Sequence, residues 1–415
     1  MIPYAVFRHR QFAYFWVGKF LTTLATLMIS VAIGWQVYVV ARLTHNIRES
    51  SFLVGMVGLA QFLPLFALVL IAGAAADRYE RRKILLGCTA LQLMAALALL
   101  FQSLSPTPSL TGLFLTAGFF GVGRAFSMPA GTALAPSLVS QQILPQAVTW
   151  NTLATQIGMV LGPWLGGLLC AISPLWAYSF ASSLYLIAGI FGVLLLVMKL
   201  DVRPKHSGAS RLVMIQEGLH YLWKSKIVLG AISLDLFAVF LGGVTALLPV
   251  FARDILHIGA DGFGLLRSGP AVGAGLVTLI LSAKPIRRHA GAWMLLSVFV
   301  YGIATTVFAF SRSISLSLMM LAILGAADSV SVFVRQSLVQ IVTPDHMRGR
   351  VSAVSSLFIS ASNELGEFES GVAARLLGPI GAVVFGGVGS IVVTSVWGAL
   401  FPALRKADKL EPPEL

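Results

Sequence analysis

Long apolar runs separated by short polar stretches dominate this sequence. A helix needs roughly 20 apolar residues to cross the hydrocarbon core of a bilayer. Applied along the chain, this length predicts an all-α membrane protein with twelve spanning helices. We place them at residues 12–40, 52–76, 84–104, 110–135, 148–171, 175–198, 227–252, 262–283, 292–311, 314–341, 351–376 and 379–402.

The composition supports a membrane location. The chain is 57% hydrophobic and 11% charged, whereas soluble domains are roughly 45–50% apolar and about 25% charged. The mean hydropathy of +0.87 points the same way. The net charge of +13 does not indicate a nucleic-acid partner, because Lys and Arg form short clusters between apolar runs instead of a continuous stripe.

The distribution of positive charge predicts the orientation. Of the 29 Lys and Arg residues, 20 fall in the terminal and connecting segments on the side of the N-terminus and 5 on the opposite side. Lys and Arg accumulate in cytoplasmic loops. We therefore expect both termini to be cytoplasmic, in a bacterial inner membrane. The first apolar run outlasts a signal-peptide core and should remain as an anchor.

A polar interval between the sixth and seventh predicted spans divides the chain. Its second part, residues 211–226, has the pattern of an amphipathic helix lying on the membrane surface, with Leu212, Ile215, Leu219 and Leu222 on one face. The expected domains are an N-terminal six-helix half, a cytoplasmic linker, a C-terminal six-helix half and a cytoplasmic tail, at residues 1–198, 199–226, 227–402 and 403–415.

A weak internal repeat agrees with two related halves. At an offset of 204 residues, Gly121 aligns with Gly325, and the segment LGPWLGG at 161–167 aligns with LGEFESG at 365–371. Parallel repeats of this kind occur in membrane transporters.

The loop after the second predicted span reads GAAADRYERRK, residues 73–83, and resembles motif A of the major facilitator superfamily, G-x-L-A-D-R-x-G-R-K. Ala75 and Glu80 replace the usual Leu and Gly. The resemblance implies two pseudo-symmetric six-helix halves and a cytoplasmic latch, in which a carboxylate meets the positive end of a helix. A plain positive-inside loop would account for the arginines alone. The matching residues are Gly73, Asp77, Arg78, Arg81 and Arg82.

The fifth predicted span carries GMVLGPWLGG, which matches the G-x-x-x-G-P-x-x-G-G antiporter motif, also called motif C, of the same superfamily. Small residues at this spacing let helices approach closely, and packing alone is the alternative interpretation. In the family the motif is associated with proton-coupled exporters, so we expect efflux. The matching residues are Gly158, Gly162, Pro163, Gly166 and Gly167.

Nearly the whole chain is similar to the enterobactin-exporter-like branch of the superfamily, the transmembrane secretion effectors. Segments that carry the likeness include GVGRAFSMPA and MRGRVSAVSSLFISASNELGEFESG. The resemblance implies proton-coupled antiport of an amphipathic small molecule, such as a siderophore or a drug-like compound. A lysophospholipid flippase of the same fold is the alternative, and a non-transporting membrane sensor is less favoured.

The sequence gives no indication of an enzyme. It contains no G-K-[ST] phosphate loop, no H-E-x-x-H and no G-x-S-x-G. We expect no cofactor and no metal, because all seven histidines lie in predicted loops, helix ends or the linker. The expected partners are a small-molecule substrate, protons and the lipid bilayer, with the protein as a monomer.

Several ionisable residues lie inside the predicted spans. A charge in mid-membrane costs at least about 2.5–3.5 kcal/mol and normally faces a partner or a water-filled cavity. Arg124 and Asp328 occupy equivalent repeat positions with opposite signs, as either a structural ion pair or a pair that forms and breaks during transport. The candidates for proton coupling are Asp235, Glu364, Glu367, Asp328 and Arg124.

The glutamates of the eleventh span differ in position. At ~1.5 Å per residue, Glu364 lies roughly 20 Å into the membrane and shares a helical face with Glu367. Glu369 points about 140° away from Glu364 and is expected to be an interfacial bystander, neutralised by Arg375. Neutral, hydrogen-bonded glutamic acids are the structural alternative, and Asp235 is the strongest competing proton carrier.

The substrate cavity is expected between the halves, formed by the first, fourth, seventh and tenth spans. Its predicted wall is apolar and aromatic with few polar groups. An arginine there would suit an anionic ligand. The candidates are Trp35, Gln36, Phe237, Phe240 and Arg335.

Overall fold

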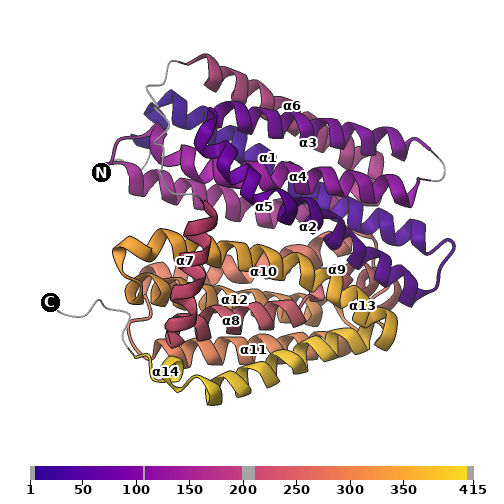
Figure 1. The fold of residues 1–415 in the computed structure, drawn as a ribbon. Coiled ribbons are helices and arrows are strands. Elements are labelled where there is room, and N and C mark those ends of the chain that lie inside the picture. Colours follow the sequence, from indigo (N-terminus) through magenta and orange to yellow (C-terminus); the bar gives the residue numbers. More distant parts are fainter. Residues whose placement is uncertain (1–4, 106–107, 199–210, 409–415) are drawn as a thin grey trace. The chain divides into compact units, whose positions relative to one another are not determined.

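The computed structural model describes residues 5–105, 108–198 and 211–408, and every regular element in these ranges is a helix (Figure 1). The elements are η1 (Ala5–Arg8), α1 (Arg10–Ala41), α2 (Ile47–Arg78), α3 (Arg81–Ser103), α4 (Leu110–Leu134), η2 (Ala135–Leu138), α5 (Leu144–Ile172), α6 (Pro174–Val197), α7 (Arg211–Lys224), α8 (Lys226–Leu241), α9 (Val244–Val250), η3 (Phe251–Ile255), α10 (Ala260–Ala283), α11 (Ala290–Phe310), α12 (Ile314–Val342), α13 (Asp345–Leu400) and α14 (Pro402–Arg405).

Within the described ranges, eleven helical segments are long and apolar enough to cross a membrane. Large apolar side chains such as Leu186, Leu279 and Phe310 are more than half exposed on them. Helices in lipid satisfy their own backbone hydrogen bonds and can expose apolar side chains at no cost. The chain is therefore an all-α, multi-pass membrane protein.

Serine residues begin three of these helices. Ser109, Ser173 and Ser313 precede α4, α6 and α12, and each side-chain oxygen accepts a hydrogen bond from a backbone N–H in the first turn. The first four N–H groups of a helix have no partner within it. A serine cap satisfies one of them where the chain turns.

The chain forms two compact units. The first consists of Met1–Thr44, Ala60–Gly208 and Ile258–Ser268, and the second of His45–Leu59, Ala209–His257 and Gly269–Leu415. The start of α2 clusters with the second unit, and the start of α10 clusters with the first.

In the first unit, α1 packs against α5 and α6, and α3 packs against α4 and α6. One end of this bundle has an aromatic cluster, in which the indole N–H of Trp16 donates to the carbonyl of Trp150 at 2.8 Å. Phe12 and Phe15 are buried beside it. Burying a large side chain of this kind contributes roughly 1.5–3 kcal/mol.

In the second unit, α11 packs against α12 and α13, and α13 also packs against α8. Leu234, Met294, Val334 and Leu338 form its buried core.

The amphipathic helix α7 lies on α13, with Leu222 buried and Glu217 paired with Arg350 at 2.8 Å. Leu219, expected on the same face as Leu222, is instead exposed. The reason is that α7 turns Gly218 toward the backbone of Arg350, which a Cβ would approach to 2.8 Å. The predicted face positions Leu212 and Ile215 lie outside the described side chains.

The seventh predicted span, 227–252, is not one continuous helix. Helix α8 ends at Leu241, α9 begins at Val244, and a π-helical turn follows at Phe251–Ile255. The break falls at Gly242 and Gly243, where a Cβ would lie 2.5 Å from the Tyr301 hydroxyl and 2.6 Å from the Ser370 hydroxyl respectively. Two adjacent glycines allow the surrounding helices to reach the interrupted backbone.

The last two predicted spans, 351–376 and 379–402, belong to the single 56-residue element α13. Its helical path is interrupted at Gly378, which has φ 79° and ψ 164°. Pro379 follows and disfavours the helical conformation of the residue before it. Glycine tolerates the positive φ that results.

Helix α5 makes close contacts through the glycines of its G-x-x-x-G-P-x-x-G-G motif. A Cβ on Gly158 would lie 2.8 Å from the Thr23 methyl, one on Gly162 would lie 2.7 Å from Leu27 Cβ, and one on Gly166 would lie 2.8 Å from the Met28 carbonyl oxygen. These three glycines lie four residues apart and form one seam against α1. Gly167 faces the first turn of α10 in the same unit, where a Cβ would lie 2.6 Å from Gly264 Cα.

We predict that Gly162→Leu destabilises the protein by about 1–3 kcal/mol, because overpacking a tight contact forces the helices apart. Thermal unfolding in detergent measures the effect. Gly189→Leu is the matched control, because a Cβ on Gly189 of α6 would meet no heavy atom within 4 Å. Equal melting temperatures for the two variants would show that the seam has no role in stability.

Candidate functional site

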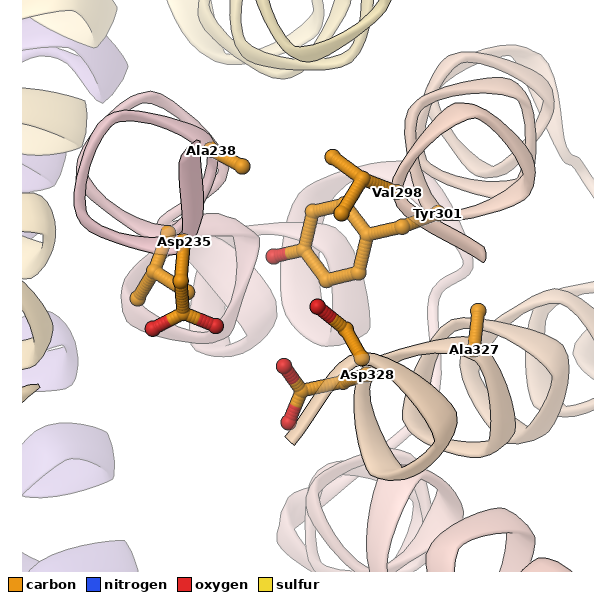
Figure 2. A pocket seen from close by; sticks show the side chains of 8 residues that line it. Asp235, Ala238, Val298, Tyr301, Ala327 and Asp328 are labelled. Atoms are coloured by element: carbon orange, nitrogen blue, oxygen red, sulfur yellow. The ribbon is translucent and has the colours of Figure 1, made fainter. Parts of the chain in front are cut away.

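A small cavity lies inside the second unit between α8, α11 and α12 (Figure 2). Asp235, Tyr301 and Asp328 direct their polar groups toward it. Its space is about that of one water molecule. The cavity therefore suits water or a small ion and excludes an organic substrate. The remaining lining residues are Ala238, Val239, Val298, Ala327 and Ser331.

A buried ion pair lies next to the cavity. The guanidinium of Arg335, on α12, pairs with the carboxylate of Asp235, on α8. Both residues are almost completely buried, with 2% and 3% exposed. Removing two charges from water costs several kcal/mol per ion, which their attraction offsets only in good geometry. Neither charge is tolerated there without the other.

Asp328 adds a second carboxylate to this pair. It is partly buried and interacts electrostatically with both Asp235 and Arg335. When both aspartates are ionised, one guanidinium faces two carboxylates, and the cluster carries one excess negative charge. A single proton on either carboxylate neutralises the cluster. The arrangement can thus hold one proton.

Tyr301 and Ser331 complete the polar lining, and neither was predicted from the sequence. The Tyr301 hydroxyl donates to the carbonyl oxygen of Gly242 at 2.8 Å, at the break between α8 and α9. Ser331 lies three residues after Asp328 and four before Arg335, so all three share one face of α12. That spacing is the sequence signal that could have identified Ser331.

The glutamates predicted as proton-coupling candidates lie away from the cavity, where α13 contacts α2 in the second unit. A Cβ on Gly58 of α2 would lie 2.9 Å from Glu367 Cβ and 3.0 Å from the backbone oxygen of Glu364. Both glutamates therefore pack against the start of α2, and neither lines the cavity. The Ser370 hydroxyl donates to Glu369 at 3.5 Å, and Arg375, its expected neutralising partner, lies over the ring of Phe52.

Arg124 lies in the first unit, where its guanidinium donates to the side-chain oxygen of Gln61 at 3.3 Å. Gln61, on α2, is a neutral partner that the sequence did not suggest. Asp328, which occupies the equivalent repeat position, lies in the second unit beside Asp235 and Arg335.

The five substrate-cavity candidates are distributed over the two units. Gln36 is buried in the first unit, where its amide donates to Ser103 and accepts from Tyr178 at 2.7 Å. Trp35 stacks on Phe263. In the second unit Phe237 packs against Trp397, and neither it nor Phe240 lines the cavity. Arg335 is the candidate that lies at the charged cluster.

The arginines of the motif A loop bind backbone carbonyls of the first unit. Arg82 donates to the carbonyls of Leu195 and Met198, at the end of α6, at 2.9 and 2.6 Å, and Arg81 donates to Ala133, near the end of α4, at 3.0 Å. The last carbonyls of a helix lack internal partners and carry partial negative charge. These arginines therefore tie the loop to two helix C-termini.

The other motif A positions lie along the same loop. Gly73 is buried within α2, Asp77 is partly buried near its end, and Arg78 lies over the ring of Tyr79. Glu80 precedes α3 and pairs with Arg82.

Apolar helices around buried, paired charges define this molecule as a multi-pass membrane protein. The sequence model of the transmembrane secretion effector family matches residues 1–412. The chain belongs to this family, whose members are transporters of the major facilitator type.

Named relatives include enterobactin exporters. The chain is similar to enterobactin exporter EntS of Citrobacter koseri, with 25% identity over 407 residues, covering 97% of this chain and 95% of the relative. Similarity to enterobactin exporter EntS of Escherichia coli O1:K1 / APEC is 27% over 379 residues, covering 91% and 86%.

Solved transporter structures share the fold. A D-xylose-proton symporter superposes with a TM-score of 0.72 at 15% identity, covering 97% of this chain and 99% of that structure. The nucleoside transporter NupG gives 0.67 at 13% identity, covering 94% and 99%. At these identities the likeness concerns the fold alone.

We predict that Arg82→Ala loosens the end of α6, because three carbonyl contacts of its guanidinium are lost. Hydrogen–deuterium exchange should rise about tenfold in the last turn of α6, as expected for a loss of roughly 1.4 kcal/mol of local stability. Lys83→Ala, which alters a largely exposed neighbour, should leave this turn unchanged. Equal exchange in both variants would contradict the prediction.

We also predict that Arg335→Met destabilises the protein by about 3–5 kcal/mol, because it leaves Asp235 buried without its counter-charge. The double variant Asp235→Asn with Arg335→Met should recover part of this loss, since both charges of the pair are removed and only Asp328 is left without the guanidinium. Thermal unfolding of the two single variants and the double variant measures the coupling. Arg288→Met, at an exposed arginine, is the control. Additive effects would mean that the pair is energetically unimportant.

Proposed function

We propose that the chain is a secondary active exporter that exchanges protons for an amphipathic small molecule by alternating access. The supporting observation is the cluster of Asp235, Asp328 and Arg335, in which two carboxylates share one guanidinium beside a cavity of about one water molecule. Adding or removing one proton changes the net charge of this buried cluster by one.

A change of charge at this place biases the conformation. A ligand shifts a conformational equilibrium only through its different affinity for the two states. The protonated, neutral cluster is stable in a closed, apolar surrounding, whereas the deprotonated cluster carries a negative charge that favours a state open to water. Proton uptake on one side and release on the other then drive the cycle.

The direction and the substrate class rest on other observations. The relatives are named as exporters of enterobactin, and the α5 glycines match the antiporter motif. A siderophore or a drug-like compound of similar polarity is therefore the proposed cargo. The described cavity is too small for such a molecule, so the cargo binds elsewhere in the proposed twelve-helix monomer.

The bias of Lys and Arg supports a cytoplasmic location for both termini of a protein in the bacterial inner membrane. The proposed transport cycle requires no cofactor. Asp77 and the arginines of motif A are proposed to form the cytoplasmic latch, with the carboxylate acting at a helix end.

The test is transport by purified protein in proteoliposomes, with enterobactin as the first probe and drug-like compounds and a lysophospholipid as further probes. We predict that Asp328→Asn lowers pH-gradient-driven efflux at least about tenfold and leaves counterflow without a gradient nearly unchanged, because only the driven mode needs a titrating carboxyl. Asp235→Asn should also lose driven efflux, with lower stability because Arg335 loses its counter-charge.

Glu369→Gln is the control and should retain driven transport, whereas Glu364→Gln and Glu367→Gln test the competing acidic residues. If both aspartate variants keep full gradient-driven efflux, the proton-coupling role of the cluster is wrong. If the wild-type protein moves only the lysophospholipid, the substrate class is wrong.

A further inference from the structure

We propose that Ser331 is a positioning residue that holds one water molecule, through which a proton passes between Asp328 and Asp235. This inference rests on the proposed function. It adds a route for the proton and a residue that does not itself titrate.

The Ser331 side chain has an unused hydroxyl. The residue is 2% exposed and lines the cavity, and its Oγ has no hydrogen-bond partner among the residues that the structure describes. A buried hydroxyl without a partner costs roughly 1–3 kcal/mol. A buried water molecule normally makes two to four hydrogen bonds. Most of this cavity's wall is apolar, and the polar groups that it offers are the Ser331 hydroxyl and the carboxylates of Asp235 and Asp328.

The two carboxylates differ in their pairing. Asp235 is 3% exposed and forms the ion pair with Arg335, whereas Asp328 lies beside this pair and interacts with it electrostatically. In the relay Asp328 is therefore the proton donor and Asp235 the acceptor. The Tyr301 hydroxyl already donates its proton to Gly242, so it does not compete with Ser331 as a donor to the water.

The ionisable groups around the water are Asp235 from α8, Tyr301 from α11, and Asp328 and Arg335 from α12. In the relay step the neutral Asp328 carboxyl gives its proton to the water, and the water gives another of its protons to the Asp235 carboxylate. One O–H bond breaks and one forms at each transfer, and no co-reactant is needed.

The net charge of the cluster stays constant during this step, but the negative charge moves from Asp235 to Asp328. Arg335 then faces a neutral Asp235 and an ionised Asp328, both of which interact with it electrostatically. The attraction that joins α8 to α12 weakens in consequence. Proton movement through Ser331 is thus linked to the packing of these two helices.

The experiment compares Ser331→Ala with Ser182→Ala in proteoliposomes with enterobactin. Ser182 is the matched control, because it is also a buried serine whose Oγ has no partner within the described ranges, and it lies on α6 and does not line the cavity. Ser331→Ala should slow pH-gradient-driven efflux about tenfold, with unchanged counterflow and melting temperature. Ser331→Thr, which retains a hydroxyl, should restore most of the rate.

A second readout is the pH profile of driven efflux. The loss in Ser331→Ala should be largest where proton transfer limits the rate. Replacing H₂O by D₂O should slow the variant more than the wild-type protein, because the impaired proton transfer limits the rate of the variant. Ser182→Ala should match the wild type in both measurements.

Three outcomes would overturn the inference. Wild-type driven efflux in Ser331→Ala is the first, and an equal loss of counterflow and thermal stability, which indicates packing alone, is the second. The third is efflux driven equally well by a sodium gradient at constant pH, which would place a cation in the cavity. If Asp328→Asn and Asp235→Asn fail in driven efflux while Ser331→Ala does not, this inference is wrong and the proposed function stands.

Discussion

A charge buried among apolar helices has to be buried together with its counter-charge, and the second unit is organised around one such pair. Asp235 on α8 and Arg335 on α12 are 100 positions apart and almost fully buried. The two helices are held together by an attraction that packing alone would not supply, because lipid and helix side chains are equally apolar. Tyr301 adds a third helix by donating to Gly242. The cavity lies where these three helices meet, between the polar groups of Asp235, Tyr301, Asp328 and Ser331 and apolar side chains.

The helices of the first unit are held together by different interactions. Its contacts depend on glycines that bring α5 against the backbone of α1 and the start of α10, and on arginines that bind the carbonyl ends of α4 and α6. Close approach increases dispersion contacts, and charged donors satisfy carbonyls that would otherwise lack partners. The two family motifs thus have a local structural role in this chain, in addition to any role in transport.

The sequence predicted features that depend on neighbouring residues, and it did not predict those that depend on contacts between residues far apart in the chain. Helix positions depend on local apolarity, so a minimum length of about 20 apolar residues located the spanning helices. This criterion missed the break between α8 and α9, because the two glycines there are explained by contacts with Tyr301 and Ser370 from distant helices. Asp235, Asp328 and Arg335 were recognised singly as charges in spans, but their association depends on the packing of α8 and α12. Gln36 was predicted to line the substrate cavity, and its hydrogen bonds with Ser103 and Tyr178 could not be predicted because these residues are distant in the sequence.

The size of the cavity constrains any mechanism in which this cluster couples protons to a larger cargo. A space for about one water molecule cannot hold both, so the two ligands cannot compete directly for one carboxylate in this conformation. The proton and the cargo therefore have to be coupled through a conformational equilibrium that both of them shift. In such a coupling, each ligand changes the binding affinity for the other by the same factor. Helix α8 is suited to transmit this coupling for two reasons. In the proposed relay, the strength of its ion pair with α12 depends on which carboxylate holds the proton. The helix also ends at Gly242–Gly243, so α8 can shift without straining a continuous helix. On the proposed function, the charge cluster responds to the proton and the helix break permits the movement.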